Sequence, residues 1–187
     1  MRNTKVSLVI AVASGLLLLM LVSSPAVAEK KSLDKILGYV DGAAFVELAG
    51  DDAVVEISIH GGLLKMLASV DPELEEMAGG LESIHAVIVE AEDKETNRQL
   101  VDLMRRTESR LMGQGWERLA RVKDDETEIK VLVLNDEEAI LGLVVMVTGD
   151  DDEFVFANIA GTLNLAAIAA IGESLDIPGL DELGNGD

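Results

Sequence analysis

The sequence predicts a single α+β domain in which helices pack on one face of a largely antiparallel sheet, in the element order β-α-β-α-β-β-β-β-α. Three patterns predict this fold. Residues 53–60 alternate between apolar and polar side chains, residues 93–112 carry the apolar stripe of an amphipathic helix, and four strand-like segments with short polar turns follow that helix.

The first half of the domain alternates strands with helices. In the first strand, residues 53–60, Val55, Ile57 and Ile59 alternate with Glu56, Ser58 and His60, the pattern of a half-buried strand. Gly61-Gly62 ends this strand before a short apolar helix, an acidic helical turn follows at 73–77, and the second strand is expected at 84–89. The clearest helix runs from Asp93 to about Met112, with apolar residues at helical spacing from Leu100 to Leu111.

The second half is expected to be a four-strand meander with strands at 116–122, 128–134, 139–147 and 153–160. The turns between them are so short that only antiparallel hairpins can form. An apolar helix from Leu163 to about Leu175 closes the domain. Two segments suggest a strand that passes through glycine into a helix, and their similarity is a weak indication of internal symmetry. They are Ile59-His60-Gly61-Gly62-Leu63 and Ile159-Ala160-Gly161-Thr162-Leu163.

The first 28 residues have the pattern of an export signal. Arg2 and Lys5 precede an uncharged apolar run of 17 residues, Val6 to Val22, and the small residues Ala26-Val27-Ala28 form a signal-peptidase site. We expect cleavage after Ala28, which leaves no stable membrane anchor; the alternative is an uncleaved anchor at the short limit of a membrane span. The protein would then be exported, as a periplasmic or secreted protein.

We therefore divide the chain into four parts by composition and pattern: a signal peptide at 1–28, an N-terminal arm with a short helix or ordered segment at 29–52, the α+β domain at 53–176 and an acidic flexible tail at 177–187. The chain has no cysteine, so its stability must come from the core. Its net charge of −20 disfavours DNA, RNA and anionic lipids as partners, since binding these polyanions requires basic residues at the contact.

Several of these segments resemble a known family. They are Val55–Gly62, Gly115–Val122, Gly142-Leu143, Val144–Val147 and Asn158–Gly161. The chain is similar, over nearly all of Tyr39 to Leu175, to the bacterial domain of unknown function 4252. The resemblance implies an exported protein without an established activity. It also implies a link to envelope signalling, through the proximity of such genes to those of envelope-stress sigma factors.

Candidate catalytic and metal-binding residues are few. Glu56, Ser58 and His60 share one strand face, but same-face neighbours lie about 6.6 Å apart, too far for a side-by-side catalytic triad, and a polar sheet face is the alternative interpretation. His60 and His85 with Glu56 or Glu82 would supply three metal ligands, without the short spacing typical of such sites. We therefore expect no cofactor and no catalytic residue.

Two loop features also have both a structural and a functional interpretation. The acidic turns Asp124–Glu126 and Asp150–Glu153 are either solvated hairpin turns or weak calcium sites. They lack the alternating spacing of a calcium loop, which favours solvated turns. Gly61-Gly62 is a tight strand-to-helix turn or an anion site on free backbone N–H groups.

The charge distribution is more informative. Residues 94–123 contain eight basic and four acidic residues in an otherwise strongly acidic chain. The arginines of the long helix either balance charge internally, through pairs such as Asp102 with Arg105 or Arg106, or form an interaction face for an acidic protein partner. The candidate face consists of Arg98, Arg105, Arg106 and Arg110.

These observations favour an exported, non-enzymatic accessory or interaction protein of the bacterial envelope. Two alternatives remain open: an envelope hydrolase that uses the region of Ser58 and His60, and a weakly calcium-responsive acidic module.

Overall fold

The computed structural model describes residues 33–50, 52–69, 80–124, 127–137, 139–149, 152–164 and 168–169. Residues Leu33–Asn164 form one compact unit, which contains all the elements discussed below. The expected signal peptide and acidic tail lie outside the described residues, as does most of the expected last helix, of which Ile168 and Ala169 are described and helical. No described helix has the length and apolarity needed to cross a membrane.

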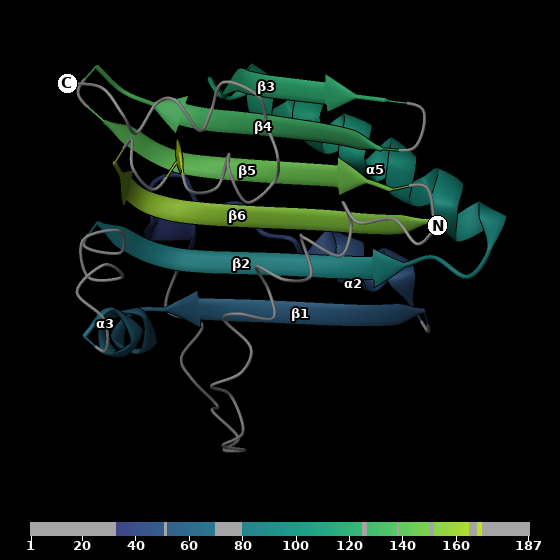
Figure 1. The fold of residues 1–187 in the computed structure, drawn as a ribbon, viewed down its shortest axis with the longest axis horizontal. Coiled ribbons are helices and arrows are strands. Elements are labelled where there is room, and N and C mark those ends of the chain that lie inside the picture. Colours follow the sequence, from purple (N-terminus) through teal and green to yellow (C-terminus); the bar gives the residue numbers. More distant parts are fainter. Residues whose placement is uncertain are drawn as a thin grey trace. The chain divides into compact units, whose positions relative to one another are not determined.

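Six strands form one antiparallel sheet in the order β1-β2-β6-β5-β4-β3 (Figure 1). The last four strands of the chain are successive neighbours, and β2 joins β1 to them by pairing with β6. The predicted α+β class and the C-terminal meander are therefore confirmed. The strands are β1 (Ala53–His60), β2 (Leu81–Glu90), β3 (Glu117–Lys123), β4 (Glu128–Asn135), β5 (Ile140–Thr148) and β6 (Glu153–Leu163).

The helices that cover the sheet lie on one of its faces, behind it in Figure 1. They are α2 (Ala43–Ala49) and α5 (Lys94–Gly113); a 3-10 turn, η1 (Leu33–Lys35), precedes α2, and α3 (Gly62–Ala68) follows β1. The helix α5 begins where the sequence predicts, because Asp93 caps it: its Oδ1 accepts hydrogen bonds from the backbone N–H groups of Glu95 and Thr96 at 2.7 and 3.1 Å.

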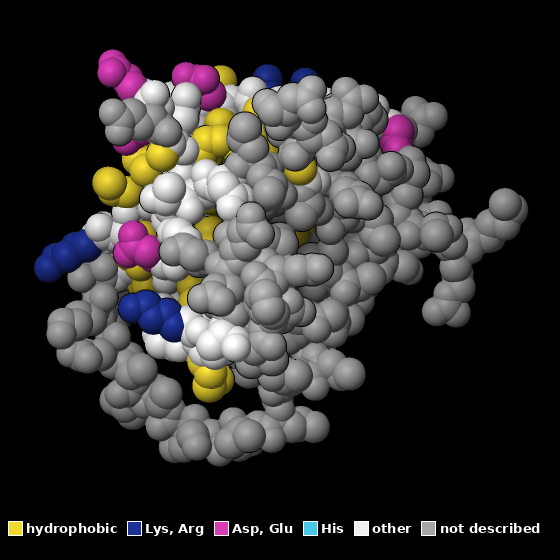
Figure 2. Space-filling view, turned by 60° about the vertical axis from the view of Figure 1, so that its left-hand side comes forward, with side chains coloured by type: hydrophobic (Ala, Val, Ile, Leu, Met, Phe, Trp, Pro, Cys, Tyr) yellow, Lys and Arg dark blue, Asp and Glu magenta, His cyan; other side chains and the backbone are white. Residues whose placement is uncertain are grey.

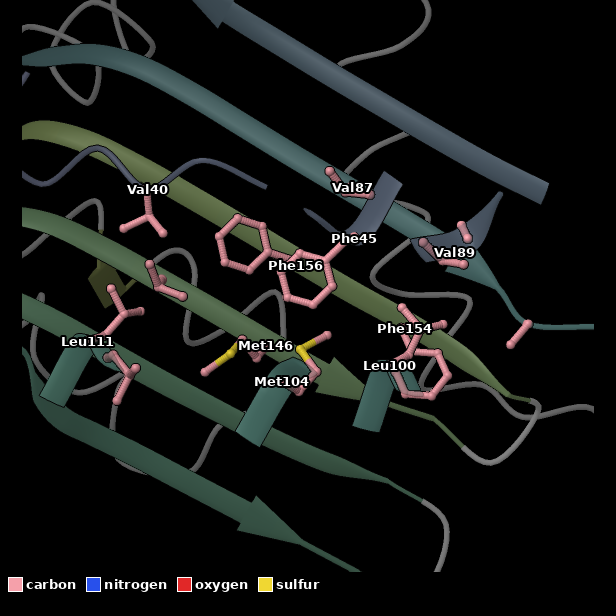
Figure 3. Packing of buried hydrophobic residues seen from close by; sticks show 14 of the residues in the cluster. Val40, Phe45, Val87, Val89, Leu100, Met104, Leu111, Met146, Phe154 and Phe156 are labelled. Atoms are coloured by element: carbon pink, nitrogen blue, oxygen red, sulfur yellow. The ribbon is translucent and has the colours of Figure 1, made fainter. Parts of the chain in front are cut away.

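The core lies between these helices and the sheet. Leu100, Met104 and Leu111 of α5 are buried among side chains of β5 and β6, and Phe45 of α2 stacks on Phe156 with ring centroids 4.9 Å apart (Figure 3). Full burial of each such side chain contributes about 1.5–3 kcal/mol. This one cluster therefore anchors both helices to the sheet.

The strand β6 is longer than predicted. It runs through Gly161 to Leu163, so the expected helix start at Leu163 is wrong. At φ +121° Gly161 passes close to the start of β2, where a Cβ atom would lie 2.4 Å from the carbonyl oxygen of Gly80. Gly61 instead leads directly into α3, so the two similar segments adopt different structures and give no support to internal symmetry.

The alternation predicted for β1 is present, but its polar side chains face the helices. Ser58 is opposite His85, and His85 is opposite Asn158, on the face that carries Phe156. The second face of the sheet is also apolar, with Val131, Val145 and Val155 buried there. A period of two predicts which side chains share a face, but not which face the helices cover.

Candidate functional site

A polar cluster lies where the segment before α2 crosses the sheet. Asn158 of β6 is fully buried at its centre. The backbone N–H of Val40 donates to Asn158 Oδ1 at 2.9 Å, and Asn158 Nδ2 donates to the carbonyl oxygens of Gly38 at 2.9 Å and Leu143 at 3.2 Å. One buried amide therefore fastens this N-terminal segment to the sheet.

Glycines allow the same segment to approach β5 closely. At Gly38, φ is +80° and a Cβ atom would lie 2.1 Å from the carbonyl oxygen of Leu141. At Gly142, a Cβ atom would lie 2.7 Å from the Cα atom of Gly38 and 2.9 Å from the ring of Trp116. A side chain at either position would therefore push the segment away from Asn158.

His85 of β2 stands beside Asn158 and contacts the same segment. Its ring stacks on Tyr39 with centroids 6.4 Å apart and an interplanar angle of 11°. Its Nε2 lies 3.3 Å from Glu56 Oε1, close enough for an ion pair when the imidazole is protonated, and its buried Nδ1 has no hydrogen-bond partner. Tyr39 and Glu56 thus flank a buried imidazole.

The surroundings of Tyr39 are acidic. Burial raises the pKa of its hydroxyl, and the carboxylates of Asp41, Asp34 and Glu56 raise it further. Ionisation of this phenol is therefore less favourable than that of a free tyrosine.

The structure places the predicted set of Glu56, Ser58 and His60 on the same face as His85. The Cα partner of Ser58 is His85, and that of His60 is Ser83. Neither nitrogen of His85 makes a hydrogen bond, and the buried Ser83 Oγ has none either, so the described residues include no serine activated by His85. The arrangement gives the hydrolase interpretation no support.

The metal and anion interpretations gain no support either. No group of three or more potential ligands comes together within the described part of the chain, including His60, His85, Glu56 and Glu82. Four residues of the acidic turns, Asp125, Glu126, Asp150 and Asp151, lie outside that part. Gly61 and Gly62 form the tight turn into α3, which has only seven residues.

The arginines of the candidate interaction face differ in their partners. Arg105 Nη1 lies 2.9 Å from Asp102 Oδ1, and Arg98 pairs with Glu95, so both make pairs within their own helix. Arg106 donates from Nε to the backbone carbonyl oxygen of Asp102 at 3.3 Å. Neither Arg106 nor Arg110 forms an ion pair with any carboxylate in the described ranges, and both are exposed.

Three basic residues of β3 and β4, namely Arg118, Arg121 and Lys130, form ion pairs with carboxylates of the described residues. Glu108 of α5 is buried between Arg118 and Lys130, with Lys130 Nζ 2.9 Å from its Oε2. Burial acts to raise the pKa of Glu108, but hydrogen bonds from Lys130 and Arg118 outweigh it and hold the pKa below its usual value. Arg121 likewise pairs with Glu128. In the view of Figure 2 the described charged side chains are interspersed with apolar ones and form no patch of one sign.

Sequence reasoning missed Asn158, Tyr39 and Glu108. A signal existed for two of them: Asn158 interrupts an otherwise apolar strand, and Glu108 is next to Thr107 on the apolar stripe of α5. A polar residue at a position that periodicity predicts to be buried requires a partner. The partners themselves lie too far away in sequence to be identified.

The comparisons with known proteins agree with the resemblance. No curated protein and no solved structure matches the chain. Residues 45–171 match the family described as Domain of unknown function (DUF4252), and this range includes the whole sheet, α5 and most of α2. The chain belongs to the DUF4252 family.

Proposed function

We propose that the protein is an exported, non-enzymatic accessory protein of the bacterial envelope, and that the exposed face of α5 binds an acidic region of a partner protein. Export is supported by the N-terminal sequence, with its basic residues, apolar run and Ala26-Val27-Ala28 site. Intact-mass measurement on protein from the native envelope tests this part. A chain that begins at Glu29 supports export with cleavage, and a chain that retains residues 1–28 contradicts it.

The observation that carries the proposed binding face is the pair Arg106 and Arg110. They lie one helical turn apart, so their side chains share a face. The chain has 35 acidic and only 15 basic residues, so carboxylates for internal pairing are abundant. Two neighbouring exposed arginines that form no ion pair with a described carboxylate can therefore pair with the carboxylates of an acidic partner.

The experiment compares two double charge reversals in affinity capture from envelope extract. Arg106→Glu with Arg110→Glu should abolish capture of the partner and leave the fold intact. The control, Arg98→Glu with Arg105→Glu, makes the same change in net charge where the arginines are paired, and should retain capture. Capture by the unsubstituted protein should also weaken as salt is raised. Capture that survives reversal of Arg106 and Arg110 at low and moderate salt contradicts the proposal.

A further inference from the structure

The two edges of the sheet differ in how they are protected against further strand pairing. Within the described part of the chain, β1 and β3 each have a strand neighbour on one side only. The edge strand β3 carries Arg118, Arg121 and Lys123, and its register with β4 shifts between Arg118 and Ala120. Charged side chains and bulges are the usual means of blocking an edge strand, so β3 is protected.

The edge strand β1 has no bulge and fewer charged side chains than β3. It pairs with β2 in continuous register from Ala53 to His60, without a bulge. It contains no lysine, arginine or proline, and Glu56 is its only carboxylate. Val55 is 47% exposed, an apolar side chain open to solvent on this edge. A straight, largely apolar edge of this kind is a template for another strand.

We propose that β1 pairs in antiparallel fashion with β1 of a second copy of this chain, about a two-fold axis at Ile57. This register pairs residues 54–60 of the two copies, with Val55 opposite Ile59 and Glu56 opposite Ser58. Two Glu56 side chains directly opposite each other would oppose self-pairing most strongly, because like charges repel. In this register Glu56 is opposite Ser58, so that arrangement is avoided. The helix-covered faces of the two sheets also lie on the same side of the dimer, because directly opposed residues of an antiparallel pair point to the same face.

A second copy fits this edge better than an open chain of copies. Pairing of β1 with β1 uses the same edge on both copies and closes at two. Pairing of β1 with β3 would continue without end, but the basic, bulged β3 edge opposes it. The net charge of −20 opposes association at long range, and this repulsion is screened beyond about 8 Å at physiological ionic strength.

Sedimentation equilibrium on the protein purified from its native envelope tests the proposal. The expected mass is that of two chains. The affinity of the dimer should increase as salt is raised, whereas the partner binding proposed for α5 should weaken. Val55→Lys places a charged side chain on the β1 edge, so it should shift the mass to one chain and leave the circular dichroism spectrum unchanged. The matched control is Leu119→Lys on the β3 edge, where the side chain is 36% exposed, and it should remain dimeric.

A cysteine scan tests the register independently. The chain has no cysteine, so a single introduced thiol reports its own neighbourhood. Ile57→Cys should give a disulfide-linked dimer under mild oxidation, because residue 57 is opposite its own copy. Leu119→Cys should give none. A one-chain mass for the unsubstituted protein at high concentration, or a dimer that persists in the Val55→Lys variant without cross-linking at position 57, overturns the proposal.

Discussion

Replacement of Asn158 by alanine should destabilise the domain strongly, because this buried side chain makes the hydrogen bonds that join Gly38 and Val40 to the centre of the sheet. It makes three hydrogen bonds, to the N–H of Val40 and to the carbonyl oxygens of Gly38 and Leu143. At about 1 kcal/mol each, their loss amounts to about 3 kcal/mol. The orphaned Val40 N–H adds about 1–3 kcal/mol. We therefore expect the free energy of unfolding to fall by about 4 kcal/mol or more, out of the roughly 5–15 kcal/mol typical of a domain.

The assay is urea unfolding followed by fluorescence of Trp116, the single tryptophan, which is buried beside Gly142. Hydrogen exchange at the Val40 amide reports the local contact, and its protection should be lost. The matched control is Asn97→Ala, which removes an exposed hydrogen bond to Asp152 and should cost less than about 1 kcal/mol.

If Asn158→Ala does not fold, Asn158→Asp keeps the prediction testable. Aspartate keeps the acceptor for Val40 but loses both donors and places a buried carboxylate beside two carbonyl oxygens. The folded state would then favour the protonated carboxyl, which can donate one hydrogen bond, so stability lost at neutral pH should recover as the pH falls. A cost of less than about 1 kcal/mol for Asn158→Ala, with the Val40 amide still protected, would refute this account of the segment.

The elements that were predicted well are those determined by local chemistry. The predicted strand at 53–60 matches β1 residue for residue, because alternation defines it and Gly61, at φ +56°, ends it. The helix predicted from Asp93 has Asp93 as its cap, and the predicted pair of Asp102 with Arg105 forms. The helix cap and the ion pair both depend on residues at most four positions apart.

The end of β6 could not be predicted in the same way. Gly161 predicts a turn as well as it predicts a strand that passes close to another backbone, and only the tertiary contact with Gly80 decides between them. Within the candidate site, Asn158 and Val40 are 118 positions apart. The register of β2 between β1 and β6 brings His85 and Asn158 side by side. Strand pairing between residues so far apart in the sequence is not encoded in any local pattern.

Two further substitutions test the core and its charged border. Trp116 is 6% exposed, so Trp116→Ala should cost about 3 kcal/mol in thermal or urea unfolding; an unchanged midpoint would contradict its packing against Gly142. Glu108 has a pKa lowered by Lys130 and Arg118, so its stabilising contribution is present above its unfolded pKa of about 4.3 and is lost as the pH falls through the lower folded value. Glu108→Gln should therefore destabilise the protein at neutral pH by about 1–3 kcal/mol and should lose this part of the acid dependence, since glutamine does not titrate. Denaturation midpoints measured from neutral to acid pH should converge between the two proteins as the pH falls below the unfolded pKa and through the lower folded pKa of Glu108. Curves that remain parallel over this range would show that Glu108 contributes through its packing and not through its charge.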